Sequence, residues 1–375
     1  MFQRAAAQGY PAALSNLGLL HLRGAAGLPA DEAAAEALIG RAARMGHPGA
    51  RFNLATLLLN GQGGLAPDAA EAGRLLRLAA AQGNPDARAE LAWRCLEGWP
   101  AGGIAGQDPA GAVRLSGLAA AQGHAQGERL LGWCHLRGLG GLAPDEAEAC
   151  RLLRLAAAKG DVVAARELGW HYFLERRRVD PDRPPLLGPE AEEAAALLRR
   201  AAGGGDALAL YRLAVCHFKG DGGLPMDQAE ALRLLREAAD LGLASAEALA
   251  GTALARGLLA GVVDREEGLR LLRRGADQGD VAGQSELGTL LWGGLAGVRR
   301  DEAEGLRLLR LAAEGGCEYA QYNLAQALLC AERPGGAGRG SDGREPLRLL
   351  SLAAAGGLAA AQYRLSTLVQ GPRAA

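Results

Sequence analysis

The chain repeats one alanine-rich phrase at a nearly constant interval. A glycine closes this phrase ten times, and six of the nine intervals between successive glycines are 37 residues long. These anchor glycines are Gly9, Gly46, Gly83, Gly123, Gly160, Gly205, Gly242, Gly279, Gly316 and Gly357. Because a repeat array grows in one dimension and each unit contacts only its neighbours, this period predicts similar units that cover one another's apolar faces.

Each unit has room for two helices when positions are counted from the preceding anchor glycine. Leucine stands at +8 in nine units and Gly or Ala at +9 in nine, which predicts a first helix, A, that crosses its neighbour closely. Paired glycines at +15 and +18, as in Gly61 and Gly64, supply the positive φ of a turn and end this helix.

An aspartate four residues after the second glycine predicts the start of a second helix, B. These aspartates are Asp31, Asp68, Asp145, Asp227, Asp264 and Asp301. A glutamate follows three residues later in five units, as a capping box requires, and an arginine follows three residues after that. The five expected ion pairs are Glu71/Arg74, Glu148/Arg151, Glu230/Arg233, Glu267/Arg270 and Glu304/Arg307.

The composition suits closely packed helices. Hydrophobic residues make up 49% of the 375 residues but aromatic residues only 4%, so the apolar mass is largely Ala and Leu, which favour helices. We therefore predict an all-α fold, a right-handed α/α superhelical solenoid of helix-turn-helix repeats forming one domain over 1–375. The predicted repeats are 10–46, 47–83, 84–123, 124–160, 161–205, 206–242, 243–279, 280–316 and 317–357, with partial units at 1–9 and 358–375.

Segments such as "ARAELAWRCLEG" and "ALYRLAVCHFKGDGGLPMDQAEALRLLREAADLG" resemble the Sel1-like repeat family, which is related to tetratricopeptide repeats. The resemblance covers essentially the whole chain and implies an α-solenoid that acts as a scaffold or adaptor for other proteins. The usual tyrosine at +12 is present only as Tyr172. It is replaced by histidine at His21, His135 and His217, which puts in doubt any binding mode that depends on that aromatic ring.

The net charge and the cysteines indicate which partners and which cellular location to expect. The formal net charge is −1, so we expect no nucleic-acid partner, and no apolar run is long enough for membrane insertion. Six cysteines without a CxxC motif favour a reducing, cytoplasmic location. The partial units at both ends lack polar caps, from which we expect possible self-association.

Catalytic motifs are sparse. The most enzyme-like fragments contain Cys134/His135 and Cys216/His217, but adjacent helical residues point about 100° apart, so packing is the favoured interpretation over metal binding or catalysis. We expect no enzyme activity, cofactor or metal site. The alternative comes from the resemblance: some cysteine-rich family members are β-lactamase-like or carbohydrate-active cell-envelope proteins, but they carry regularly spaced disulfide cysteines that this chain lacks.

Position +10 is predicted to face away from the packed side of helix A. Three consecutive repeats place tryptophan there, and charged residues occupy the neighbouring +6 and +7 positions. The predicted partner-binding residues are Trp93, Trp133, Trp170, Arg129, Arg166, Glu90 and Glu167. Tryptophan and arginine dominate many interfaces, so this face, predicted to be concave, is expected to bind a protein or peptide; the alternative is that each tryptophan only covers helix packing.

Three insertions between helices A and B lengthen their repeats, beginning at Glu97, Glu175 and Glu332. Their prolines and glycines predict surface loops. The second insertion combines three arginines, Arg176 to Arg178, with three prolines, so it is either an interaction loop or a solvated spacer.

Overall fold

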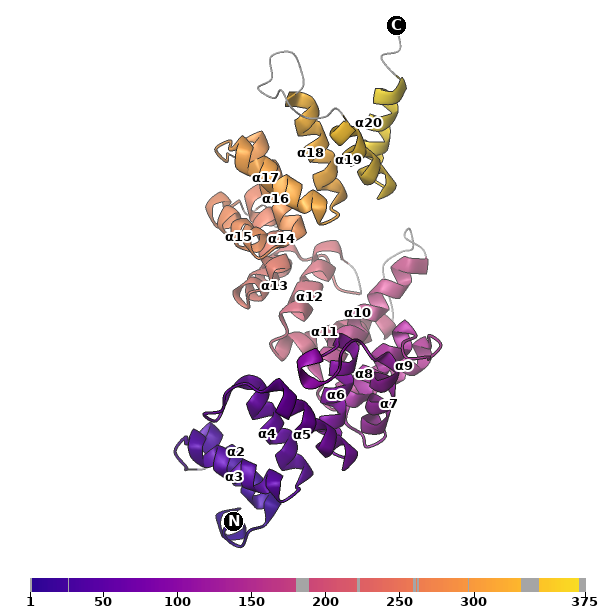
Figure 1. The fold of residues 1–375 in the computed structure, drawn as a ribbon. Coiled ribbons are helices and arrows are strands. Elements are labelled where there is room, and N and C mark those ends of the chain that lie inside the picture. The colour runs from indigo at the N-terminus through magenta and orange to yellow at the C-terminus, as the bar shows by residue number, and fades with distance from the viewer. Residues whose placement is uncertain are drawn as a thin grey trace. The chain divides into compact units, whose positions relative to one another are not determined.

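The structure is a computed structural model that describes residues 2–25, 27–179, 189–220, 223–258, 261, 263–295, 297–331 and 344–370. Regular structure in these ranges is helical, with one isolated bridge between Trp99 and Ile104 (Figure 1). The A helices are α2 (Pro11–Arg23), α4 (Pro48–Asn60), α6 (Pro85–Glu97), α8 (Ala125–Arg137), α10 (Val162–Val179), α12 (Ala207–Lys219), α14 (Ala244–Arg256), α16 (Val281–Gly293), α18 (Glu318–Ala331) and α20 (Ala359–Gln370). The B helices are α1 (Phe2–Ala7), α3 (Glu32–Arg44), α5 (Ala69–Ala81), α7 (Pro109–Ala120), α9 (Glu146–Ala158), α11 (Pro189–Gly203), α13 (Gln228–Asp240), α15 (Arg265–Asp277), α17 (Glu302–Glu314) and α19 (Arg344–Ala355).

Contacts divide the chain into two compact units, residues 1–168 and 169–375, and each is described by itself. Within each unit an A helix packs against the B helix that follows it, and that B helix packs against the next A helix. The prediction of an all-α fold built from helix hairpins is confirmed.

The second leucine of the "RLL" phrase lies at the centre of five hairpins. Leu76, Leu153, Leu235, Leu272 and Leu309 occupy this position and are almost completely buried. Buried alanines stand one turn before three of them, at Ala72, Ala149 and Ala231. Replacing one such leucine with alanine typically costs about 2–5 kcal/mol, so a single row of leucines carries much of the packing energy.

Small residues at +9 allow the two helices of a hairpin to cross closely. A Cβ atom added to Gly251 would lie 2.7 Å from the carbonyl oxygen of Gly268, and one added to Gly288 would lie 3.0 Å from that of Gly305. All ten anchor glycines have positive φ, between 75° and 97°. Their recurrence therefore follows from the left-handed turn that joins helix B to the next helix A.

The six predicted aspartates each accept a hydrogen bond from a backbone N–H in the first turn of a B helix, for example Glu71 N to Asp68 Oδ1 at 2.9 Å. The reciprocal half of the predicted capping box is wrong. The N–H of Asp68 donates to the carbonyl of Leu58 in the preceding A helix, at 3.1 Å, and the other five aspartates bond in the same way. With that donor satisfied, the glutamate side chain is released for another partner.

That partner is the arginine three residues later in four of the five predicted pairs. Arg74 Nε donates to Glu71 Oε2 at 2.7 Å, and the same contact recurs in Glu148/Arg151, Glu230/Arg233 and Glu304/Arg307. This hydrogen bond lowers the pKa of each glutamate. The fifth prediction is wrong, because Glu267 accepts from Arg236 of the neighbouring B helix at 2.7 Å.

The first insertion is more than a surface loop. Its short helix η1 (Pro100–Gly102) and the bridge between Trp99 and Ile104 fold it against α5, and Trp99 is only 9% exposed. Arg77 Nη1 of α5 donates to the Gly102 carbonyl at 2.7 Å. Most of the second insertion and nearly all of the third, including the predicted interaction loop with Arg176, Arg177 and Arg178, lie outside the residues whose side chains are described.

Candidate functional site

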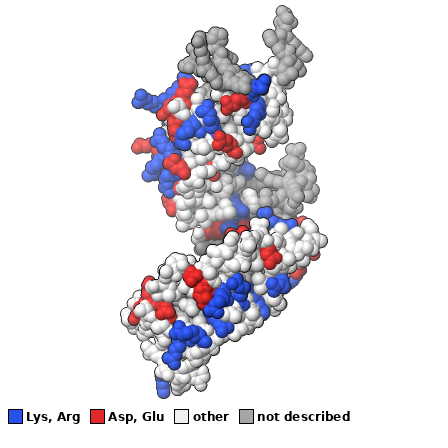
Figure 2. Space-filling model, in the orientation of Figure 1, with Lys and Arg blue, Asp and Glu red and all other residues white. Residues whose placement is uncertain are grey.

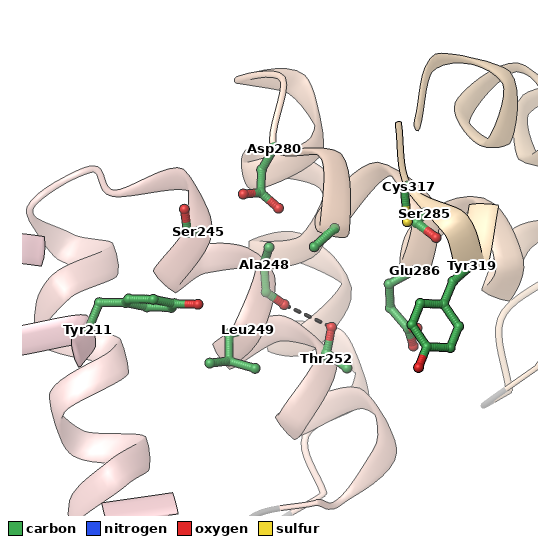
Figure 3. A pocket seen from close by; sticks show the side chains of 11 residues that line it. Tyr211, Ser245, Ala248, Leu249, Thr252, Asp280, Ser285, Glu286, Cys317 and Tyr319 are labelled. Carbon is green, nitrogen blue, oxygen red and sulfur yellow. Dashed lines mark hydrogen bonds between the residues drawn. The ribbon is translucent and has the colours of Figure 1, made fainter. Parts of the chain in front are cut away.

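Four successive A helices of residues 169–375 line a cavity of about 400 Å³ (Figure 3). It is lined from α12, α14 and α16 and by the start of α18. Its residues recur at +3, +6, +7 and +10 of successive repeats, and we call this set of positions the A face. The lining residues at these positions are Tyr211, Ser245, Ala248, Leu249, Thr252, Ala282, Ser285, Glu286 and Tyr319. A polypeptide segment crossing several repeats meets equivalent positions on each of them.

Two tyrosines lie at opposite ends of this cavity in Figure 3, Tyr211 on α12 and Tyr319 at the start of α18. Tyr319 is 65% exposed. Burial, together with the negative charge of Asp280, raises the pKa of Tyr211. The Tyr211 hydroxyl therefore stays protonated near neutral pH and can donate or accept a hydrogen bond.

Acidic and hydroxyl groups lie between the tyrosines. Asp280 caps α16 by accepting a hydrogen bond from Gly283 N at 2.7 Å, and Glu286 forms an ion pair with Arg256. The Thr252 hydroxyl donates to the carbonyl of Ala248 at 2.9 Å (Figure 3). The cavity thus offers two aromatic side chains, the carboxylates of Asp280 and Glu286, hydroxyl groups and the Cys317 thiol, which together can hold polar or cationic side chains.

Trp93, on α6, is 36% exposed and stands at +10, the position that Thr252 occupies in the cavity. Glu90, one turn earlier, accepts a hydrogen bond from Arg94 Nε at 2.8 Å. Trp93 is therefore available to a partner, whereas Glu90 is engaged within its own helix.

Trp133, on α8, is half-buried and packs against a cluster that includes Ala92, Leu130 and Cys134. The guanidinium of Arg137 lies 4.8 Å from its ring centroid. Arg129 Nε donates to Asp161 Oδ2 at 3.1 Å, and both side chains are largely buried. Trp133 thus covers helix packing with part of its ring, and Arg129 holds the start of the next A helix.

Trp170, on α10, is half-buried, and the guanidinium of Arg212 lies 4.8 Å from its ring centroid. On the same helix, Arg166 Nε donates to Glu167 Oε1 at 3.0 Å. The predicted charged residues therefore take part in contacts within the protein, and Trp93 presents the most open ring of the predicted set.

The Cys-His fragments are built into the packing. Cys134 and Cys216 are buried, and burial raises the pKa of Cys134 to about 11. His217 Nδ1 lies 3.2 Å from the Pro225 carbonyl, and His135 Nδ1 is buried without a hydrogen-bond partner in the described part of the chain. All six cysteines are free. A thiol with a raised pKa is a weak nucleophile at neutral pH, so Cys134 lacks the features of a catalytic nucleophile.

The described surface carries both signs of charge, and Figure 2 shows basic and acidic side chains on the visible face of each unit. Among the described residues, no group of three or more His, Cys, Asp and Glu side chains could hold a metal ion. Within the same ranges, no helix combines the length and apolar character needed to cross a bilayer.

Comparison with known protein families shows to which family the chain belongs. The family model described as "Sel1 repeat" matches residues 11–47, 48–84, 85–124, 125–161, 207–243, 244–280 and 281–317, which is more than half of the chain. The chain belongs to the Sel1 repeat family. Proteins of this family are commonly protein-interaction scaffolds and generally non-catalytic. The comparison with curated proteins returns no match.

Solved structures agree with this family and fold. A protective antigen of uropathogenic Escherichia coli with an SLR fold is 29% identical, with a TM-score of 0.66, over 99% of this chain and 74% of its own. A Sel1 repeat protein from Oxalobacter formigenes is 24% identical, with a TM-score of 0.59, over 70% of this chain and 99% of its own.

The residues predicted from sequence stand at +6, +7 and +10 in other repeats than those of the cavity, and position +3 was not among the predicted positions. Thr252, Ser285 and Glu286 are small or common helical residues that give no signal alone. Aromatic residues are rare in this chain, and Tyr211 and Tyr319 stand at +6 and +3 of helix A. An alignment of all the repeats by these positions could therefore have identified the two tyrosines.

Proposed function

We propose that this Sel1 repeat protein is a non-enzymatic scaffold that binds a protein or peptide segment along its A face, on the concave side of the array. The observation that carries the proposal is the cavity between Tyr211 and Tyr319, lined at the register positions that hold Trp93 and Trp133 in other repeats. Repetition of equivalent positions suits an extended ligand that contacts several A helices in turn.

Exposed aromatic side chains supply the anchors in this proposal. Trp93 and Tyr319 present large rings to solvent, and aromatic residues in shallow pockets supply a large share of interface energy. In the second unit, a cationic side chain of the partner fits between Tyr211 and Asp280. A cytoplasmic location belongs to the same proposal, and the six free cysteines are compatible with it. The alternative of a disulfide-stapled envelope enzyme gains no support from these thiols.

A titration with a captured partner tests the proposal. The purified chain serves as bait in a lysate, the bound polypeptide is identified by mass spectrometry, and its affinity is measured for four variants. We expect Trp93→Ala and Tyr319→Ala each to weaken binding by at least about tenfold, as for aromatic anchors at other interfaces. Leu78→Ala and Leu311→Ala are matched controls, since these exposed leucines lie on B helices. Equal losses in all four variants, or losses only in the controls, would contradict the A-face assignment.

A further inference from the structure

A second cavity lies away from the A face, within residues 1–168. It has a volume of about 430 Å³, between the B helices α5 and α7, and is closed on one side by the folded first insertion. Three arginines line it, Arg77, Arg88 and Arg114, and we call it the arginine pocket. Its apolar wall includes Leu91, Ile104 and Leu115. Cavities of this size hold small organic ligands.

The insertion wall of this pocket is held in place by specific contacts. Arg77 donates to the Gly102 carbonyl, and the main chains of Trp99 and Ile104 exchange two hydrogen bonds, of 2.8 and 2.9 Å. Gly73, at a position where each of the other repeats has a side chain, leaves room for Gly102. The wall therefore depends on residues of two successive repeats.

Another pair of repeats contains an equivalent cavity with which the arginine pocket can be compared. An equivalent cavity of about 180 Å³ lies between α17 and α19, where Arg310 and Arg348 occupy the register positions of Arg77 and Arg114. There, Glu314 and Glu345 also line the cavity and balance the two arginines. The corresponding residues in the first unit are Ala81 and Gly111, so the arginine pocket is lined by three positive charges and no carboxylate.

Two of the three arginines have partners within the chain. Arg77 bonds to Gly102, and Arg88 donates to the carbonyls of Ala80 and Leu118. Arg114 has no hydrogen bond or ion pair among the described residues, and Gly111 stands three residues before it, where four repeats have a glutamate that binds the equivalent arginine. The pocket thus combines an apolar wall with an arginine whose usual intramolecular carboxylate is missing.

We propose that the arginine pocket binds an apolar carboxylate, with the carboxylate at Arg114 and the hydrocarbon body against Leu91, Ile104 and Leu115. The bound carboxylate replaces the glutamate found in other repeats. Arginine binds carboxylates through paired, charge-assisted hydrogen bonds, and the lining leucines and isoleucine bury the hydrocarbon. This inference is independent of the A-face proposal, because it concerns a different surface.

Calorimetric titration with octanoate tests the pocket in the full-length chain, with octanol and octylamine as probes that share its hydrocarbon body. We expect octanoate to bind saturably and at least about tenfold more tightly than either probe, in line with the strength of charge-assisted bonds. A peptide ending in leucine with a free carboxylate, compared with its amidated form, distinguishes a polypeptide terminus from a free acid as the source of the same group. Equal binding of octanoate and octanol would overturn the proposal.

Three variants locate the site. Arg114→Gln should weaken octanoate binding about tenfold, whereas Arg348→Gln, in the reference cavity, should leave it unchanged. Gly111→Glu supplies the missing intramolecular carboxylate, so it should weaken octanoate binding to a similar degree. Its Cβ atom would lie 2.1 Å from Asp108 Oδ2, so the Asp108 side chain must turn, and circular dichroism checks that the helices are kept. Undiminished binding in both Arg114→Gln and Gly111→Glu would show that octanoate does not use this pocket.

Discussion

Replacing Gly73 with alanine should detach the first insertion from α5 while leaving the helix itself at least as stable. A Cβ atom at this position would lie 2.3 Å from the carbonyl oxygen of Gly102, whereas ordinary contact begins at 3.4 Å. The insertion must therefore move by roughly 1 Å, because the neighbouring atom belongs to main chain and not to a flexible side chain.

This movement lowers the local stability of the insertion. It breaks the hydrogen bond from Arg77 to Gly102, and a bond with a charged donor contributes about 1.5–3 kcal/mol. The guanidinium is on an exposed side chain, so we take the lower end of this range. Partial exposure of Trp99 adds to the loss, which brings the fall in local stability to about 1.5–2.5 kcal/mol. Alanine stabilises α5 by up to about 1 kcal/mol, so the change in overall stability is small.

Hydrogen exchange measures the two effects separately. The amides of Trp99 and Ile104, which are hydrogen-bonded to each other's carbonyls, should exchange about ten- to sixtyfold faster in Gly73→Ala. Gly117→Ala, on α7, is the control, because no atom lies within 4 Å of the added Cβ; it should leave that exchange unchanged and raise the melting temperature. Unchanged exchange in Gly73→Ala, or equal acceleration in both variants, would show that contact with Gly73 does not hold the insertion in place.

The remaining predictions concern capping, ion pairs and thiols. Asp68→Ala should lower the free energy of unfolding by about 1 kcal/mol in denaturant titrations, because the first turn of α5 loses its cap, and an unchanged midpoint would contradict this role. The lowered pKa values of Glu71, Glu148, Glu230 and Glu304 give a small stabilisation that is complete above the unfolded-state pKa and lost as pH falls through the folded-state values, below 4.5. Arg74→Gln should therefore reduce the dependence of melting temperature on pH below about 5, and an unaltered pH profile would count against the pair. Cys330 is exposed and should react quickly with a thiol reagent, whereas buried Cys134, whose pKa is about 11, should react only on unfolding; equal rates in the folded protein would contradict the burial.

The fold was predictable because each repeat contains several independent sequence signals for the same helix hairpin. Glycines at fixed positions indicate turns, aspartates indicate helix starts, and Ala and Leu indicate close helix packing. The hydrogen bond from the Asp68 N–H to Leu58 was not predictable, because it joins two helices whose orientation is set by tertiary packing. The pairing of Glu267 with Arg236 depends in the same way on neighbouring repeats.

The candidate sites were less predictable, because cavities form between repeats rather than within them. Register predicts which positions of helix A share a face, but whether Trp93 is open and Trp133 half-buried depends on neighbours such as Arg137. The prolines and glycines of the first insertion suggested a solvated loop. Gly73, whose missing side chain accommodates that insertion, lies in an earlier repeat, so the contact appears only once both repeats are folded.

Site-specific photo-crosslinking measures whether the A face binds a polypeptide. A photoreactive phenylalanine derivative is introduced singly at Trp93 and Tyr319 on the A face, and at Leu78 and Leu311 on B helices, all of which are exposed. We predict that one polypeptide crosslinks to the chain through both A-face positions and that excess unlabelled chain competes it away, with little product from the B-helix positions. Equal crosslinking from all four positions, or crosslinking confined to Leu78 and Leu311, would contradict it.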